Sequence, residues 1–112
     1  MDVSVLVPLF NEAESLPSLH AWIVRVMKEH ALSYEIVFVN DGSNDDSWQV
    51  IQSLREQDEH VKGICFRRNY GKSAALHCGF QMVQGDVVIT MDADLQGSPD
   101  EIPELYRMIK ED

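Results

Sequence analysis

Four short apolar runs rich in β-branched residues recur along the chain at intervals of roughly 25–30 residues, the length of one strand plus one helix. They are Val3–Val7, Glu35–Val39, Val61–Phe66 and Asp86–Met91. Each run is nearly continuous in its hydrophobicity instead of alternating, which is typical of parallel strands covered on both faces. The pattern predicts a layered α/β fold built on a mainly parallel sheet.

The segments between the runs carry apolar residues three or four positions apart, which indicates helices with one buried face. The first two stripes are Leu16, Leu19, Ile23 and Val26, then Trp48, Ile51 and Leu54. A third helix is expected over residues 71–83. We interpret these stripes as core packing, together with Trp22, Met27, Met82 and Met108.

A fourth helix is expected to begin at Ser98-Pro99, a capping serine followed by a proline at the first helical position. Its apolar residues Ile102, Leu105 and Ile109 are expected to face the core. The chain of 112 residues has room for one domain. Because it stops one helix after its most informative motif, we expect residues 1–112 to be a domain truncated at its C-terminal end.

The chain is acidic, with 19 acidic and 9 basic residues and a formal net charge of -10. Such a surface repels a phosphate backbone, so nucleic acid is not an expected partner. A nucleotide remains possible if a metal cation lies between the carboxylates and the phosphates. The composition therefore favours a metal–nucleotide site over a nucleic-acid interface.

Cys65 and Cys78 lack the spacing of a zinc or redox pair, and we expect two reduced thiols in the core. No basic-then-apolar leader opens the chain, and no apolar run approaches the roughly 20 residues that span a bilayer. We therefore expect this segment to lie in the cytoplasm.

Polar residues follow each of the four apolar runs, at residues 8–12 (PLFNE), 40–43 (NDGS), 67–72 (RRNYGK) and 92–96 (DADLQ). In open α/β sheets, ligands bind beyond the carboxyl ends of the strands. We expect these four segments to converge on one edge of the sheet and to form the functional site.

Asp92 and Asp94 stand two positions apart after the fourth run, a spacing that projects both carboxylates to the same side. Two carboxylates and a diphosphate repel one another unless a hard dication lies between them. The motif predicts a Mg²⁺ or Mn²⁺ site. A solvated acidic turn is the alternative interpretation.

Each of the other candidate residues has two possible roles, one in ligand binding and one in the structure. Asp41 is expected to accept hydrogen bonds from a base or ribose, with Gly42 letting the ligand approach, or to cap the next helix. Glu12 holds a ribose hydroxyl or favours the start of the first helix. Lys72 and the pair Arg67-Arg68 offer charge to a phosphate or form a solvated patch.

Taken together, the segments VSVLVPLFNEAESLP, EIVFVNDGSNDDS, FRRNYGKSAAL and MDADLQGSPDEIP resemble the ordered motifs of family-two glycosyltransferases. The resemblance is strongest to the branch that moves sugars onto polyprenyl or dolichyl phosphate. It implies a Rossmann-like GT-A fold with strand order 3-2-1-4, and the N-terminal, nucleotide-binding part of it. It also implies a nucleotide-sugar donor, UDP- or GDP-linked, and a lipid-phosphate acceptor at the cytoplasmic face of a membrane.

Carried over by position, the resemblance implies that the base and ribose contact Pro8, Phe10, Glu12 and Asp41. It places the metal on Asp92, Asp94 and Gln96, with Asp92 and Lys72 also binding the nucleotide. The family's catalytic base and acceptor loops come later than position 112. We therefore expect this segment alone to be inactive in transfer. Because later strands and helices of the family's fold would cover the fourth strand, we also expect the segment to self-associate through the uncovered sheet edge.

Two rival functions are open on the sequence. One is a phosphatase or phosphotransferase that uses Asp92 as nucleophile and Asp94 as acid. That class carries its DxD after the first strand, whereas here the motif follows the fourth. The other rival is a nucleotide-binding module without catalysis.

Overall fold

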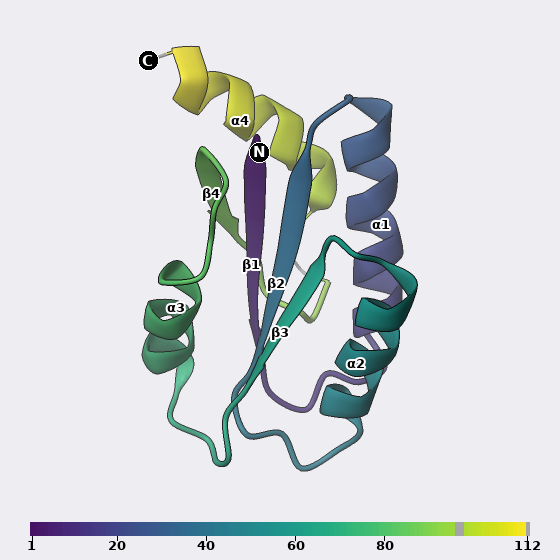
Figure 1. Cartoon of the computed structure of the whole chain (residues 1–112), viewed down its shortest axis with the longest axis vertical. Coiled ribbons are helices and arrows are strands. Elements are labelled where there is room, and N and C mark those ends of the chain that lie inside the picture. Colours follow the sequence, from purple (N-terminus) through teal and green to yellow (C-terminus); the bar gives the residue numbers. More distant parts are fainter. Residues whose placement is uncertain (96–97, 112) are drawn as a thin grey trace.

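Four parallel strands form one sheet in the order β3-β2-β1-β4 (Figure 1). They are β1 (Val3–Leu9), β2 (Tyr34–Asn40), β3 (Val61–Cys65) and β4 (Val87–Thr90). This computed structural model describes residues 1–95 and 98–111. The order and the parallel direction confirm the α/β fold expected from the spacing of the apolar runs and from the resemblance.

Helices cover both faces of the sheet, as Figure 1 shows. On one side lie α1 (Leu16–Glu29) and α2 (Ser47–Gln57), and on the other lies α3 (Lys72–Phe80). The 3-10 turn η1 (Pro99–Glu101) leads into α4 (Ile102–Glu111), which lies near the amino ends of the strands. At the opposite end of the sheet, where the strands have their carboxyl ends, lie the loops that follow β1, β2 and β3.

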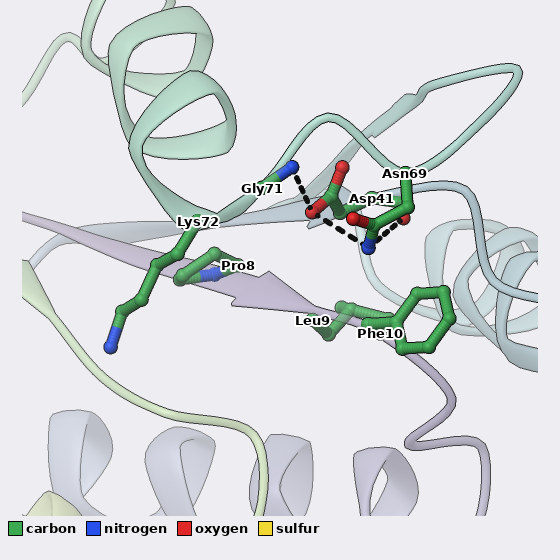
Figure 2. Close-up of a pocket in the computed structure, with 7 residues that line it drawn as sticks. All are labelled: Pro8, Leu9, Phe10, Asp41, Asn69, Gly71 and Lys72. Atoms are coloured by element: carbon green, nitrogen blue, oxygen red, sulfur yellow. Dashed lines mark hydrogen bonds between the residues drawn. The ribbon is translucent and has the colours of Figure 1, made fainter.

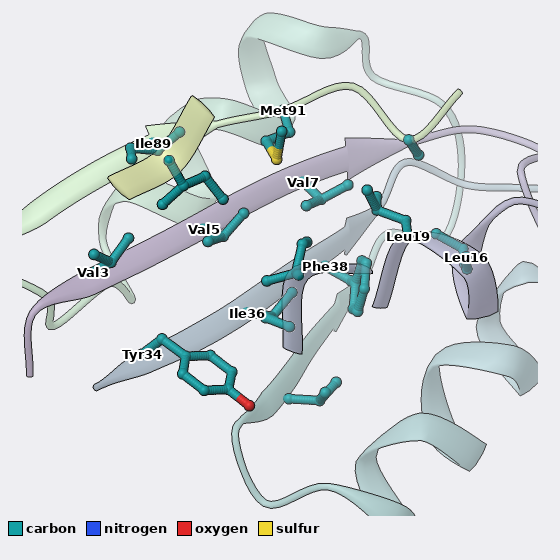
Figure 3. Close-up of a cluster of buried hydrophobic side chains, with 14 of the residues drawn as sticks. Val3, Val5, Val7, Leu16, Leu19, Tyr34, Ile36, Phe38, Ile89 and Met91 are labelled. Atoms are coloured by element: carbon teal, nitrogen blue, oxygen red, sulfur yellow. The ribbon is translucent and has the colours of Figure 1, made fainter. Parts of the chain in front are cut away.

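The central strands β1 and β2 are buried along their whole length. Val5, Val7 and Phe38 face α1 in the larger apolar cluster (Figure 3), whereas Leu6 and Val37 face α3 in the smaller one. Because side chains alternate between the faces, a strand covered on both sides has apolar residues at every position. This explains the continuous runs in the sequence.

The edge strand β3 is less buried than its apolar run suggests, with a fully covered side chain only at Val61. Cys65 at its end is exposed and Cys78 on α3 is half-buried, and both are free thiols. The prediction of two core thiols was wrong. An edge strand has only one neighbour, so fewer side chains cover its end.

The predicted inner face of α4 was also wrong in part. Ile102 is fully buried, but Leu105 and Ile109 are 39% and 52% exposed. The helix packs through Ile102, Pro103 and the half-buried Tyr106, because it meets the body of the domain at one end of the sheet instead of lying along a face. Met82 and Met108 are likewise exposed and are not core residues.

A buried carboxylate on β2 joins β1, β3 and the loop before β4 near the amino ends of the strands. Glu35 is 1% exposed and accepts hydrogen bonds from Ser4 Oγ at 2.5 Å, Lys62 Nζ at 2.6 Å and the backbone N–H of Gln84 at 2.6 Å. Burial raises the pKa of Glu35, but these bonds outweigh it and hold the pKa below its ordinary value. These hydrogen bonds therefore tie this end of the sheet together.

Candidate functional site

The loops after β1 and β2 are joined by hydrogen bonds from side chains to backbone. Asn11 adopts a positive φ of 54°, which asparagine tolerates better than most residues. Its side-chain oxygen accepts from Asn44 N at 2.8 Å, and its own N–H donates to Ser43 Oγ at 2.9 Å. Asp45 accepts from Ala13 N at 3.2 Å. The first two loops therefore form one braced unit.

Gly42 lets the loop after β2 pass against the loop after β3. Its φ is 70°, and a Cβ at this position would lie 2.1 Å from the carbonyl carbon of Arg68. From the sequence, Gly42 was expected to let a ligand approach closely. In the structure it makes room for the backbone of Arg68 and Asn69.

A cavity of about 360 Å³ opens among these loops (Figure 2). The residues that line it come from the ends of β1, β2 and the loop before α3: Pro8, Leu9, Phe10, Asp41, Asn69, Gly71 and Lys72. Four of them were predicted as nucleotide-binding residues, namely Pro8, Phe10, Asp41 and Lys72. The strand ends converge as the sequence predicted, and the cavity lies where they meet.

Pro8 occupies a central strand, where a missing N–H normally costs a ladder hydrogen bond. The carbonyl of Leu6 accepts from Met91 N at 3.0 Å. In a parallel strand, every second residue directs its N–H and C=O to the same neighbour, so Pro8 faces the β4 side as Leu6 does. The pairing of β1 with β4 ends at Leu6 and Thr90. The nitrogen of Pro8 therefore faces the space beyond the end of β4, where no ladder bond is needed.

Asp41 is 5% exposed and holds the loop between β3 and α3. Its carboxylate accepts from Tyr70 N at 2.8 Å and Gly71 N at 3.0 Å, and from the Asn69 side-chain amide at 3.2 Å. Figure 2 shows Asp41 between Gly71 and Asn69 at the wall of the cavity. Asp41 does not cap α2, whose N-cap residue is Asp46; next to it, Asp45 accepts from Ser47 N, the first residue of the helix, at 2.9 Å.

Phe10 and Tyr70 give the site exposed aromatic surface, with 41% and 55% of their areas open to solvent. Phe10 lines the cavity and presents a flat ring on which a base can stack. The guanidinium of Arg68 lies 4.8 Å from the centre of the Tyr70 ring. Arg67 and Arg68 are not among the described residues that line the cavity, and Arg68 is directed to Tyr70.

A smaller cavity of about 80 Å³ adjoins the first and shares Pro8 and Lys72 with it. Its other lining residues are Thr90, Met91 and Asp92, at the end of β4. Lys72 Nζ lies 2.7 Å from Asp92 Oδ1. The larger cavity is thus connected through Lys72 to Asp92, the predicted metal ligand.

Asp92 and Asp94 are both exposed, and the buried Ala93 lies between them. Both side chains are therefore accessible from the solvent. Within residues 1–95 and 98–111, no group of three or more His, Cys, Asp or Glu side chains has the arrangement of a metal site. The donor set nevertheless fits Mg²⁺ or Mn²⁺, because such ions are held by one or two carboxylates together with substrate phosphates and water.

Glu12 and Gln96 are the other two predicted site residues. Glu12 is half-buried and is not among the described residues that line either cavity. Its carboxylate accepts from Ser15 Oγ at 3.2 Å, at the start of α1. Gln96, the third predicted metal ligand, lies outside the described residues.

Sequence reasoning missed Asn69, which lines the cavity and donates to both the backbone and the side chain of Asp41. Its segment was known to follow a strand, but nothing in its spacing marked it. Among the described residues, no helix is long and apolar enough to cross a membrane.

Comparisons with known sequences agree with one another. The model of the family described as Glycosyl transferase family 2 matches residues 4–112. The undecaprenyl-phosphate 4-deoxy-4-formamido-L-arabinose transferase of Pseudomonas fluorescens is 46% identical over 104 residues, covering 92% of this chain and 30% of its own length. The enzyme of the same name from Proteus mirabilis is 43% identical over 110 residues, covering 97% and 34%. The chain thus spans about a third of the length of these relatives.

Solved structures share the fold. Residues 1–349 of TarS from S. aureus, in complex with UDP-GlcNAc, have a TM-score of 0.73 at 20% identity, and the match covers 99% of this chain and 32% of that TarS chain. The mannosyltransferase PcManGT from Pyrobaculum calidifontis, in complex with GDP-Man and Mn²⁺, has a TM-score of 0.71 at 24% identity, covering 96% and 31%.

Proposed function

The chain belongs to glycosyl transferase family 2, and we propose that its carboxyl sheet edge binds the nucleoside diphosphate of a nucleotide-sugar donor together with a divalent cation. The observation that carries this proposal is the distribution of side chains over the two adjoining cavities. Phe10 and Asp41 line the larger cavity, Lys72 lies between the cavities, and Asp92 lines the smaller one.

This distribution fits the groups of a nucleotide sugar. A flat ring and a carboxylate suit the base, because one stacks and the other accepts N–H bonds. Lys72 supplies a positive charge where the diphosphate would lie. Asp92 and Asp94 would hold the cation, which would neutralise the charge of the phosphates. TarS and PcManGT, which share the fold, were solved with UDP-GlcNAc and with GDP-Man and Mn²⁺.

In the whole protein, we infer transfer of the sugar to a polyprenyl phosphate at the cytoplasmic face of a membrane, a step toward a cell-envelope polysaccharide. The support is the name of the relatives, undecaprenyl-phosphate 4-deoxy-4-formamido-L-arabinose transferases. Transfer would proceed by direct displacement with inversion at the anomeric carbon. The bound cation would stabilise the departing nucleoside diphosphate as a Lewis acid.

The carboxylates that we assign to donor and cation binding are not available to deprotonate the acceptor. Asp41 is engaged with the loop of residues 69–71, and Asp92 and Asp94 are given to the cation. We therefore place the catalytic base beyond position 112, and we treat residues 1–112 as the donor-binding part of a larger GT-A domain.

The proposal is tested by calorimetric titration of UDP and GDP into the chain, with Mg²⁺ or Mn²⁺ and with a chelator. Removal of the cation should lower affinity at least about tenfold, because bare phosphates face two carboxylates. Asp92→Asn combined with Asp94→Asn should lower the affinity measured in the presence of the cation, and a chelator should then have little further effect, because the cation has lost its carboxylate ligands. Asp86→Asn is the matched control, since Asp86 is an exposed carboxylate at the other end of β4.

Equal affinity with and without chelator would refute the metal assignment. A phosphatase that uses Asp92 as nucleophile would instead form a covalent phosphoryl adduct, which mass spectrometry detects. If the protein were only a binding module, it would bind the metal–nucleotide. The full-length protein would then leave a nucleotide sugar intact even with the acceptor present.

A further inference from the structure

Lys72 occupies a position that the stability of its own helix does not explain. It is the first residue of α3, and the positive end of the helix dipole disfavours a cation there. Gly71 before it has a φ of 102° and no side chain caps the helix. No acidic residue lies in the first turn to offset the charge.

The lysine is held by a contact outside its helix. Its Nζ lies 2.7 Å from Asp92 Oδ1, and the two side chains are 63% and 54% exposed. Lys72 also lines both cavities, so its ammonium stands between the space proposed for the nucleotide and the carboxylate proposed for the cation. An exposed pair of this kind is weak and exchanges readily with other ions.

We propose that Lys72 is a placeholder cation for Asp92, an inference that rests on the proposed function. Without ligand, its ammonium neutralises Asp92 and competes with a divalent cation for that carboxylate. When the cation arrives with a diphosphate, Lys72 exchanges Asp92 for a phosphate oxygen across the shared wall of the two cavities.

The exchange couples the two ligands through one side chain. Lys72 opposes the binding of the cation alone, since an ion at Asp92 must displace an ammonium. It favours the binding of the cation–nucleotide pair, because the displaced ammonium then meets a new anion within reach. The same residue therefore lowers one affinity and raises the other, and a merely structural lysine would do neither.

The test measures Mn²⁺ binding in the absence of nucleotide, from the paramagnetic resonance signal of free Mn²⁺. We expect Lys72→Met to bind Mn²⁺ about two- to fivefold more tightly than wild type, the range that exposed ion pairs allow. Lys72→Arg, which keeps a cation opposite Asp92, should stay near wild type. In the presence of Mn²⁺, Lys72→Met should bind UDP more weakly than wild type.

Lys110→Met is the matched control, because it also removes one exposed lysine next to an aspartate, with Nζ 3.7 Å from Asp86 Oδ2. That pair lies at the other end of β4 from Asp92. A general effect of net charge would change the Mn²⁺ affinity of both variants equally.

Three results overturn the inference. If Lys72→Met binds Mn²⁺ no more tightly than Lys110→Met while UDP still binds with Mn²⁺, Lys72 is not a placeholder and the proposed function stands. If Lys72→Met binds UDP as well as wild type does, the exchange onto phosphate is wrong. If wild type binds neither Mn²⁺ nor UDP, the inference and the proposed function fall together.

Discussion

Replacing Asp41 with asparagine tests whether this carboxylate builds the site as well as lining it. Its Oδ1 accepts from Tyr70 N, and its Oδ2 accepts from Gly71 N and the Asn69 amide. Asparagine has one acceptor oxygen. It keeps the most bonds if that oxygen takes the place of Oδ2, which leaves its NH₂ group facing the N–H of Tyr70.

The loss is one charge-assisted hydrogen bond and one unpaired N–H, worth roughly 1.5–3 kcal/mol. Since Tyr70 is 55% exposed, water can reach this loop, and we take about 2 kcal/mol for Asp41→Asn. For a domain of this size, that corresponds to a drop in Tm of about 8 °C. The affinity for UDP should fall as well, because the loop of residues 69–71 forms one wall of the cavity.

Urea unfolding of the ligand-free protein gives the free energy of unfolding, and calorimetry gives the UDP affinity. Asp46→Asn is the control, because Asp46 is exposed at the start of α2 and makes no side-chain cap bond. It should change stability by less than about 0.5 kcal/mol. If Asp41→Asn unfolds with the same free energy as Asp46→Asn, the carboxylate does not hold the loop and our reading of Asp41 is wrong.

Two further predictions concern the ends of the fold. Glu35→Gln should lower the free energy of unfolding by about 2 kcal/mol at pH 7, since Lys62 loses its charged partner. The pKa of Glu35 is lowered on folding from 4.5, so its contribution is present above that pH and lost as pH falls through the folded pKa. The deficit of Glu35→Gln in urea unfolding should therefore shrink below about pH 4.5, and a deficit that does not change with pH would contradict the assignment. We also expect residues 1–112 to self-associate in sedimentation experiments, because Leu105, Met108 and Ile109 expose apolar surface on one side of α4; a strictly monomeric species at high concentration would contradict this.

The sequence by itself determined the layered fold and the edge at which the site lies. A short continuous apolar run such as Val3–Val7 is typical of a strand buried on both faces. Parallel strands have their carboxyl ends on the same side of the sheet, where ligands bind. The polar residues after each run therefore mark that edge in the sequence itself. The candidate residues Pro8, Phe10, Asp41 and Lys72 do line one cavity.

Only the tertiary structure decided which partners those residues take. Asp41 and Gly71 are 30 positions apart, and their hydrogen bond follows from the packing of one loop against another. The inward face of α4 depends on where the helix meets the sheet, which periodicity does not specify. The pairing of Lys72 with Asp92 likewise requires the ends of α3 and β4 to come together. Local patterns determine which segments form strands and helices, whereas long-range contacts are set by the relative placement of those elements in three dimensions.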